Sequence, residues 1–215
     1  MGAGYKEHFR DDHRQFNKLA LNDDVFQSPI DLFDDWLRSA DENKILDYNA
    51  MSLSTSNGSG RVSSRIVYLK DVIDKSLVFF TNYDSKKGKD IELNPNGSLL
   101  FFWKELERQV RIEGRIEKVE EKISDAYFES RPVASQLGAI TSKQSEVVES
   151  RSALEQNFES VKMEHAGREI KRPSNWGGYA FIPSYFEFWQ GREHRLHDRI
   201  TFELQSNGSW KVSRI

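Results

Sequence analysis

The 215-residue sequence predicts a mainly β protein with helices (α+β), arranged as a small β-barrel with helices packed outside it. Three observations support this fold class. Short runs rich in β-branched and aromatic residues recur along the chain, turn-forming clusters separate these runs, and helical patterns do not alternate regularly with them. A doubly wound parallel sheet is therefore disfavoured.

The chain begins with a polar segment, residues 1–27, which we interpret as a flexible arm before a single domain of residues 28–215. A helix is predicted to start at Ser28, because serine caps helices and Pro29 suits the first helical position. Its apolar face carries Ile30, Phe33, Trp36 and Leu37. The sequence STSNGSG (54–60) then predicts a turn or loop.

The middle of the chain is dominated by strand signals. The predicted strands are 61–70, 76–82, 98–103 and 108–119. Gly114 lies inside the last of these strands, where an isolated glycine suggests a bulge. These strands supply most of the predicted barrel.

Helical signals follow. Ile123, Ala126 and Tyr127 share one helical face, and Pro132 interrupts the helix after them. Leu154, Phe158 and Val161 predict a second amphipathic helix. Further strands are predicted at 178–182, 185–190, 197–204 and 210–215, and Asn207-Gly208 favours a hairpin turn between the last two.

Composition excludes several classes of protein. The chain has no cysteine, so disulfides and thiolate metal sites are impossible. Its net charge of −3 and pI of about 6.0 argue against a nucleic-acid partner. No apolar run approaches the ~20 residues that span a bilayer, and the N-terminus lacks a signal-peptide core. We expect a cytoplasmic protein with no membrane partner and no bound metal.

The segment FWQGREHRLHDR (188–199) is the most informative part of the sequence. If it is a strand, alternation places Arg195, His197 and Arg199 on one face, where two guanidiniums around an imidazole could bind an anion. From composition alone, an exposed edge strand with scattered charges is the more common case. A metal site of His194, His197 and Asp198 is disfavoured, because the pleat separates the imidazoles.

Two further segments could bind phosphate. The turn DSKKGK (84–89) offers backbone amides and lysines after a strand, although a solvated basic turn is far more common. Tyr127, Arg131 and Ser135 have the spacing of one helical face, and hydroxyls beside an arginine suit a phosphate. Each signal is weak when it is taken alone.

Together these segments resemble the pyridoxine (pyridoxamine) 5′-phosphate oxidase family. The resemblance rests on the order of the strings RIVYLK (65–70), FFTNYDSKKG (79–88), ERQVRIEG (107–114), YFESRPVASQLGA (127–139), SKQS (142–145), WGGY (176–179) and EFWQGREHRLHDR (187–199). It implies an FMN-binding split β-barrel and a homodimer with two FMN sites at the subunit interface.

The resemblance also implies residue roles. FMN would be held from one subunit by Arg65, Ile66, Val67, Tyr68, Leu69, Lys70, Phe80, Thr81, Lys86, Lys87 and Gln109, and from the other by Gln144, Ser145, Trp189 and Arg199. The substrate would be bound by Lys70, Tyr127, Arg131, Ser135, Arg195, Leu196 and His197, with Arg195 and His197 as the catalytic residues over the pyridine ring. The implied reaction converts pyridoxine or pyridoxamine 5′-phosphate to pyridoxal 5′-phosphate by hydride transfer to FMN, with O2 as the final acceptor, which yields H2O2.

Two departures from the family pattern concern the site. Lys86 stands where the family often has arginine, and the N-terminal Arg-x-x-Tyr motif falls on His13 to Phe16. Two alternatives stay open: another split-barrel flavoprotein of the flavin reductase or deazaflavin type, and a non-enzymatic protein that binds FMN or pyridoxal phosphate. Tyr127, Arg131 and Ser135 argue against the first alternative, and steady-state peroxide production would exclude the second.

Overall fold

The computed structural model describes residues 16–21 and 28–215, and these residues form two compact units. Unit 1 contains the described residues up to Tyr48 together with Phe101–Arg111 and Tyr185–Ile215. Unit 2 contains Asn49–Leu100 and Ile112–Ser184. Three strands have residues in both units: β5 (Asn96–Trp103), β6 (Arg108–Lys118) and β7 (Trp176–Gln190).

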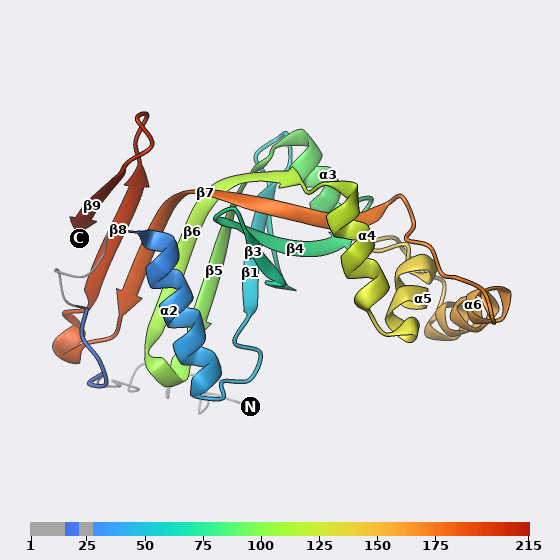
Figure 1. Cartoon of the computed structure of the whole chain (residues 1–215), viewed down its shortest axis with the longest axis horizontal. Coiled ribbons are helices and arrows are strands. Elements are labelled where there is room, and N and C mark those ends of the chain that lie inside the picture. The colour runs from blue at the N-terminus through green and yellow to red at the C-terminus, as the bar shows by residue number, and fades with distance from the viewer. Residues whose placement is uncertain (1–15, 22–27) are drawn as a thin grey trace, which may run out of the picture. The chain divides into compact units, whose positions relative to one another are not determined.

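The described strands hydrogen-bond in the order β2-β1-β5-β6-β7-β4-β3, while β8 pairs with β7 and β9 pairs with β8 (Figure 1). The remaining strands are β1 (Ala50–Ser56), β2 (Val62–Tyr68), β3 (Asp71–Ile73), β4 (Ser76–Asn82), β8 (Asp198–Leu204) and β9 (Trp210–Arg214). Pairings β1–β2, β1–β5, β3–β4, β4–β7, β7–β8 and β8–β9 are antiparallel. The predicted strands at 76–82 and 108–119 are confirmed almost residue for residue.

Helices lie in both units. They are α2 (Pro29–Glu42), α3 (Lys86–Leu93), α4 (Glu121–Ser130), α5 (Val133–Thr141) and α6 (Arg151–Glu164), with 3-10 turns at Lys104–Leu106 and Glu193–Arg195. In unit 2, α4, α5 and α6 follow one another along the chain and extend away from β4 (Figure 1). The predicted class, mainly β with helices, is confirmed.

Helix α2 begins as predicted. The Ser28 hydroxyl accepts a hydrogen bond from the Asp31 amide at 3.4 Å, and Pro29 occupies the first turn. The apolar face packs inside unit 1, where the Phe33 ring lies 5.1 Å from that of Phe101 and the Trp36 ring lies 5.3 Å from that of Phe188. Burial of this aromatic face explains why the helix forms.

The loop predicted at 54–60 is wrong in its first half. Strand β1 continues to Ser56, which pairs with Val62 of β2, and the turn occupies only 57–61. The strand buries alternate residues, among them Leu53 and Thr55. The serines of β1 make this alternation difficult to recognise in the sequence, because a small polar residue gives the same local signal in a loop and on the open face of a strand.

Gly114 has a steric reason to be glycine. A Cβ atom there would lie 2.1 Å from the carbonyl oxygen of Ile182 and 2.8 Å from the Phe181 ring. Inside unit 2, strand β6 therefore approaches β7 more closely at residue 114 than a side chain at that position would allow. This contact accounts for the isolated glycine that the sequence associated with a bulge.

The C-terminal strands differ from the prediction in one respect. Segments 178–182 and 185–190 are parts of a single strand, β7, which passes through Pro183 without a break. The hairpin at Asn207-Gly208 is confirmed, because Gly208 has a φ of +82° and the Gln205 amide donates to the Ser209 carbonyl at 2.8 Å. Strands β8 and β9 pair on either side of it.

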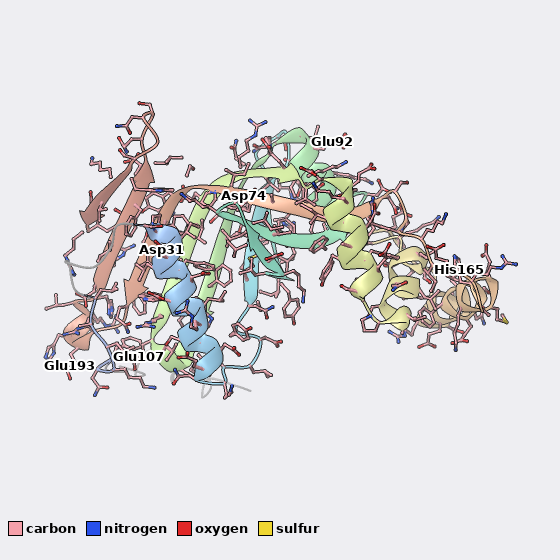
Figure 2. All side chains as sticks on the ribbon, in the orientation of Figure 1. Asp31, Asp74, Glu92, Glu107, His165 and Glu193 are labelled. Atoms are coloured by element: carbon pink, nitrogen blue, oxygen red, sulfur yellow. The ribbon has the colours of Figure 1, made fainter. Side chains whose placement is uncertain are left out.

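Part of the expected flexible arm is anchored. Within unit 1, the Lys18 ammonium donates to the Glu105 carbonyl at 2.6 Å, and its amide donates to the carboxylate of Glu107, labelled in Figure 2, at 3.3 Å. Leu21 is buried. Residues 16–21 therefore do not behave as a free arm, and the rest of the 1–27 segment lies outside the described residues.

Among the described helices, none has the length and apolar character needed to cross a membrane.

Candidate functional site

Unit 2 contains a cleft of about 910 Å³, within the range of small-molecule sites. Strands β2 and β4, helices α3, α4 and α5, and the segment after α5 form its walls. The predicted site residues that line it are Arg65, Ile66, Val67, Tyr68, Lys70, Phe80, Thr81, Lys86, Lys87, Tyr127, Arg131, Ser135, Gln144 and Ser145. Three distant stretches of sequence thus meet at one site.

Lys87 is the buried cation of this cleft. It lies in the first turn of α3, which Ser85 caps, and its ammonium donates to the hydroxyls of Thr81 at 3.0 Å and Ser85 at 3.1 Å. The Gln144 side-chain oxygen accepts a third hydrogen bond at 2.9 Å. Burial, with the nearby charge of Arg65, lowers the pKa of Lys87 to about 8. An anion placed here would relieve both costs.

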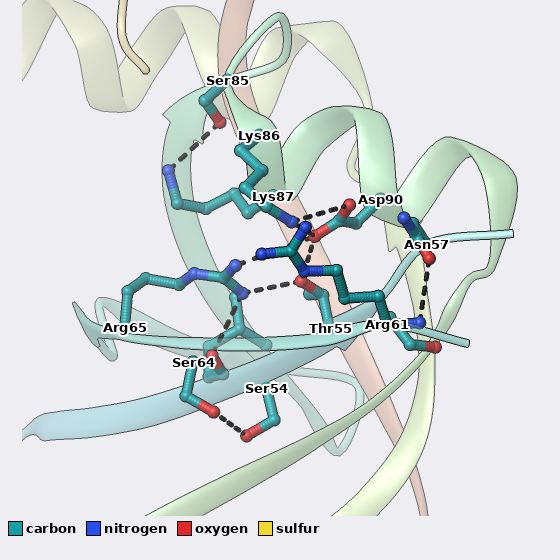
Figure 3. Close-up of polar contacts among 12 residues, drawn as sticks. Ser54, Thr55, Asn57, Arg61, Ser64, Arg65, Ser85, Lys86, Lys87 and Asp90 are labelled. Carbon is teal, nitrogen blue, oxygen red and sulfur yellow. Dashed lines mark hydrogen bonds and ion pairs between the residues drawn. The ribbon is translucent and has the colours of Figure 1, made fainter. Parts of the chain in front are cut away.

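Arg65 and Lys86 share a buried carboxylate, Asp90 (Figure 3). The Lys86 ammonium lies 3.0 Å from Asp90 Oδ2, and the Arg65 guanidinium donates to the Thr55 hydroxyl at 2.7 Å. Burial alone would raise the pKa of Asp90, but hydrogen bonds from Thr55 and Lys86 and the charges of Lys86 and Arg65 lower it. Arg65, Lys86 and Lys87 therefore exceed this one carboxylate in charge, and the end of the cleft that they form is cationic.

An aromatic wall forms another part of the cleft. The rings of Phe80 and Tyr127 stack with centroids 3.8 Å apart, and the Arg131 guanidinium lies 4.5 Å from the centre of the Trp176 ring. Arg131 Nη1 is buried and has no hydrogen-bond partner among the described residues. A buried guanidinium nitrogen without an acceptor is costly, and the cationic side chain that carries it lines the cleft.

Tyr127, Arg131 and Ser135 meet in the cleft, but they do not share one helix. Tyr127 belongs to α4, Arg131 follows the end of that helix, and Ser135 belongs to α5, which starts after Pro132. Proline cannot continue a helix through its own amide, so the chain turns between the two helices. The spacing of four predicted one helical face, whereas the three residues line the cleft from two helices and the break between them.

Gln144 and Ser145 also need a correction. The resemblance assigned them to the partner of the subunit that carries Arg65, yet they line the cleft of the same chain. The Thr81 hydroxyl donates to Gln144 at 3.0 Å, and Lys87 binds the same oxygen. The segment after α5 folds back over the start of α3, which the sequence could not indicate.

The other predicted residues of the site lie in unit 1, except Leu69, which is buried in unit 2. Those of unit 1 are Gln109, Trp189, Arg195, Leu196, His197 and Arg199. The segment 188–199 is not one strand, so the alternation considered for it does not hold; β7 ends at Gln190 and β8 begins at Asp198, in agreement with the predicted strands at 185–190 and 197–204. The two strands pair antiparallel, so the chain must reverse between them.

The reversal determines the conformation of the predicted catalytic segment. His194 and Arg195 have φ values of +55° and +62°, in the left-handed region. The Arg192 amide donates to His197 Nδ1 at 3.1 Å, so a neutral His197 carries its proton on Nε2. Burial and the charges of Arg195 and Arg199 lower the pKa of His197, which favours this neutral form.

Side chains around this turn hold its ends in place. The His197 ring lies 4.7 Å from that of Trp189, and the Phe16 ring lies 5.6 Å from His197. Glu187 is buried and accepts hydrogen bonds from Arg199 Nε at 3.0 Å and from Arg111 at 2.6 Å. Two guanidiniums thus share one carboxylate beside the turn.

Several cleft residues were missed. They include Ser63, Ser64, Asn82, Gly138, Ala139, Ser142 and Trp176. Trp176 carries no local sign of a ligand contact, because a single tryptophan is more often buried for packing than used to bind a ligand. Its place in the WGGY string was the only available signal.

Comparison with known proteins agrees with these observations. Residues 40–165 match the family model described as pyridoxamine 5′-phosphate oxidase, and residues 176–215 match the pyridoxine 5′-phosphate oxidase C-terminal dimerisation region. A curated relative from Leptospira biflexa serovar Patoc, named pyridoxine/pyridoxamine 5′-phosphate oxidase, is 53% identical over 187 residues. The match covers 87% of this chain and 88% of that relative.

Two solved structures are similar in fold. PhzG from Burkholderia lata 383, in complex with tetrahydrophenazine-1-carboxylic acid, superposes with a TM-score of 0.86 at 28% identity over 93% of this chain and 99% of its own. A pyridoxamine 5′-phosphate oxidase-related, FMN binding protein from Nostoc punctiforme superposes with a TM-score of 0.70 over 87% of this chain and 97% of its own. At 14% identity, the second similarity supports the fold alone.

The fold thus defines a split β-barrel protein with a cleft lined by cations, and the predicted split barrel is confirmed. The two matched regions and the curated relative specify more than the fold class. The chain belongs to the pyridoxamine 5′-phosphate oxidase family and is an oxidase.

Proposed function

We propose that this enzyme oxidises pyridoxine 5′-phosphate and pyridoxamine 5′-phosphate to pyridoxal 5′-phosphate, with FMN as cofactor and O2 as the final acceptor. One observation carries the proposal. A single cleft is lined by one cationic group, Arg65 with Lys86 and Lys87, and by two further cations, Lys70 and Arg131, in a chain whose net charge is −3. Two phosphorylated ligands need cations for two phosphates, and this lining offers enough for both.

The cofactor phosphate fits the end of the cleft that contains Lys87. Lys87 is buried, Arg65 lies on the adjoining strand, and the Thr81 hydroxyl and Gln144 amide surround the lysine ammonium. Ser145 and Lys86 would complete the set from the same chain. Lys86 is the weakest candidate, since its ammonium is already paired with Asp90 and about half exposed.

The substrate phosphate fits the Arg131 end of the cleft. Trp176 holds the guanidinium plane from one side, and Nη1 lacks an acceptor among the described residues. Tyr127, Ser135 and Lys70 add hydroxyls and a second cation to the same cleft. A phosphate monoester would pair with the charge of the Arg131 guanidinium.

The catalytic segment is proposed to act on the substrate ring. When bound, FMN would accept the hydride that leaves the 4′ carbon of the substrate while the 4′ hydroxyl or amine loses a proton, and O2 would take up the two electrons and two protons as H2O2. With the amine substrate, water would then hydrolyse the substrate imine and release ammonia. Arg195 would pack on the pyridine ring and orient it, with Leu196 beside it, while His197 would donate a hydrogen bond from Nε2. Gln109, Trp189 and Arg199 would contact the cofactor.

We further propose a homodimer in which unit 1 of one subunit completes the cleft of its partner. The match to a C-terminal dimerisation region over 176–215 supports this arrangement, because that region contains Trp189, Arg195, His197 and Arg199. We also propose a cytoplasmic location, because a chain of 215 residues without cysteine suits a reducing compartment.

Two measurements on the purified protein test the function. Mass spectrometry of the released cofactor should find FMN at about one per chain, and peroxide should form in steady state with pyridoxine 5′-phosphate. Tetrahydrophenazine-1-carboxylic acid, which lacks a phosphate, is the comparison substrate and should react poorly because Arg131 would stay unpaired. FAD in place of FMN, or bound FMN without peroxide, would contradict the proposal; the second result would indicate a binding protein.

A further inference from the structure

Two buried side chains lie behind the cationic end of the cleft without lining it. Thr55 on β1 is 2% exposed, and Asp90 on α3 is 4% exposed. Neither residue contributes to the cleft surface. Any influence that they have on a ligand must pass through residues that do line the cleft: Arg65 contacts Thr55, and Arg65 and Lys86 both contact Asp90 (Figure 3).

The direction of each hydrogen bond in this group follows from the chemistry of the atoms. The Thr55 hydroxyl lies 2.8 Å from Asp90 Oδ2 and 2.7 Å from Arg65 Nη1. An ionised carboxylate only accepts and a guanidinium only donates, so the single hydroxyl proton must point to Asp90. The lone pairs of the hydroxyl then face Arg65.

Asp90 itself is held firmly. Lys86, one helical turn earlier, binds both of its oxygens at 3.3 and 3.0 Å. The Arg65 guanidinium also donates to the Leu53 carbonyl at 3.1 Å and lies 3.8 Å from Asp90 Oδ2. Arginine carries a large side-chain entropy, and fixing it before a ligand arrives reduces the cost of binding.

We propose that Thr55 is a positioning residue for the anion-binding end of the cleft. Asp90 orients the Thr55 hydroxyl, and the hydroxyl fixes the Arg65 guanidinium before the ligand phosphate binds. This inference rests on the proposed function, in which the ligand at this end is FMN. It also gives the Lys86–Asp90 pair a role: Lys86 steadies the carboxylate and need not contact the phosphate.

The test compares two flavins that differ only in the phosphate. Dissociation constants of FMN and riboflavin are measured by fluorescence quenching on the flavin-free dimer. Thr55→Val keeps the side-chain volume and removes both hydrogen bonds, so the preference for FMN over riboflavin should fall about 3- to 10-fold. The riboflavin constant should not change, and Thr55→Ser should restore the preference.

Two controls isolate the route through Arg65. Ser56→Ala removes the neighbouring hydroxyl on β1, which binds Asn94 at 2.6 Å, and should leave the preference for FMN unchanged. In an Arg65→Ala background, Thr55→Val should have no further effect on the preference. An equal additional loss in that background would show that Thr55 does not act through Arg65.

The failure of this inference differs from the failure of the proposed function. A wild-type protein that binds FMN no better than riboflavin contradicts the proposed phosphate site. A wild-type protein that prefers FMN, together with a Thr55→Val variant that keeps the full preference, overturns only the positioning role. If Thr55→Val does not fold, Thr55→Ala is measured in the same way, since the ratio of the two constants corrects for general destabilisation.

Discussion

Lys87 and Arg131 show, at the scale of single residues, why the cleft suits an anionic ligand. Each is a cation removed from water, which costs free energy unless a partner replaces the lost hydration. Lys87 finds three oxygen acceptors and still has its pKa lowered to about 8. Arg131 keeps one buried nitrogen without an acceptor among the described residues. Such costs persist where a ligand offsets them.

Arg131→Ala should raise the Michaelis constant for pyridoxine 5′-phosphate about 10- to 150-fold, because it removes a charge-assisted hydrogen bond to the phosphate. The dissociation constant of FMN should stay nearly the same. Steady-state kinetics and flavin titration measure the two quantities. Arg115→Ala is the matched control, since that side chain is 63% exposed and pairs with Glu117 at the surface. A variant that loses FMN and substrate equally would contradict the assignment.

At the scale of elements, the site depends on where helices and strands stop. Pro132 separates α4 from α5, which lets Tyr127 and Ser135 reach the cleft from two helices. The turn between β7 and β8 holds Arg195 with a positive φ. The sheet of unit 2 also depends on a close contact between β6 and β7 at Gly114, where a side chain would not fit.

Gly114→Ala should destabilise the protein by about 1–3 kcal/mol, because the new methyl group would overlap the Ile182 carbonyl and the strands would have to separate. Urea unfolding monitored by circular dichroism measures the change. Gly58→Ala is the matched control, since a Cβ atom there has no neighbour within 4 Å. Equal stability of the two variants would show that the strands adjust freely.

At the scale of the whole molecule, the predicted site residues are divided between two units. The cleft with Arg65, Lys87 and Arg131 belongs to unit 2, and Arg195, His197 and Arg199 belong to unit 1. In the proposed homodimer, unit 1 of one subunit completes the cleft in unit 2 of its partner, which would bring the two sets of residues into one site. The proposed activity then depends on assembly as well as on the fold of one chain.

A mixed dimer tests this arrangement. Arg65→Ala and Arg199→Ala should each give a poorly active homodimer, while the mixed dimer should regain one intact site because each subunit supplies what the other lacks. Activity of tagged, purified heterodimers is the measurement. A mixture of Arg65→Ala with Lys87→Ala is the control and should show no rescue, since both changes fall in the cleft of unit 2. No rescue in the first mixture would place Arg199 in the site of its own chain.

Local signals in the sequence determined much of the fold. Capping at Ser28, the apolar run of β4 and the turn at Asn207-Gly208 each depend on a few neighbouring residues, and each is confirmed. The ordered motifs also identified most residues of the cleft, because a family pattern carries information about distant contacts that propensity does not.

Only the tertiary structure decided which distant residues meet. Lys87 and Gln144 are 57 positions apart, and their contact exists because the segment after α5 folds back over α3. The turn at 191–197 follows from the antiparallel pairing of β7 with β8. Thr55 and Asp90 were not identified at all, since a threonine in a strand and an aspartate in a helix carry no local sign of a shared hydrogen bond. Contacts of this kind depend on chain closure, which short-range propensities do not encode.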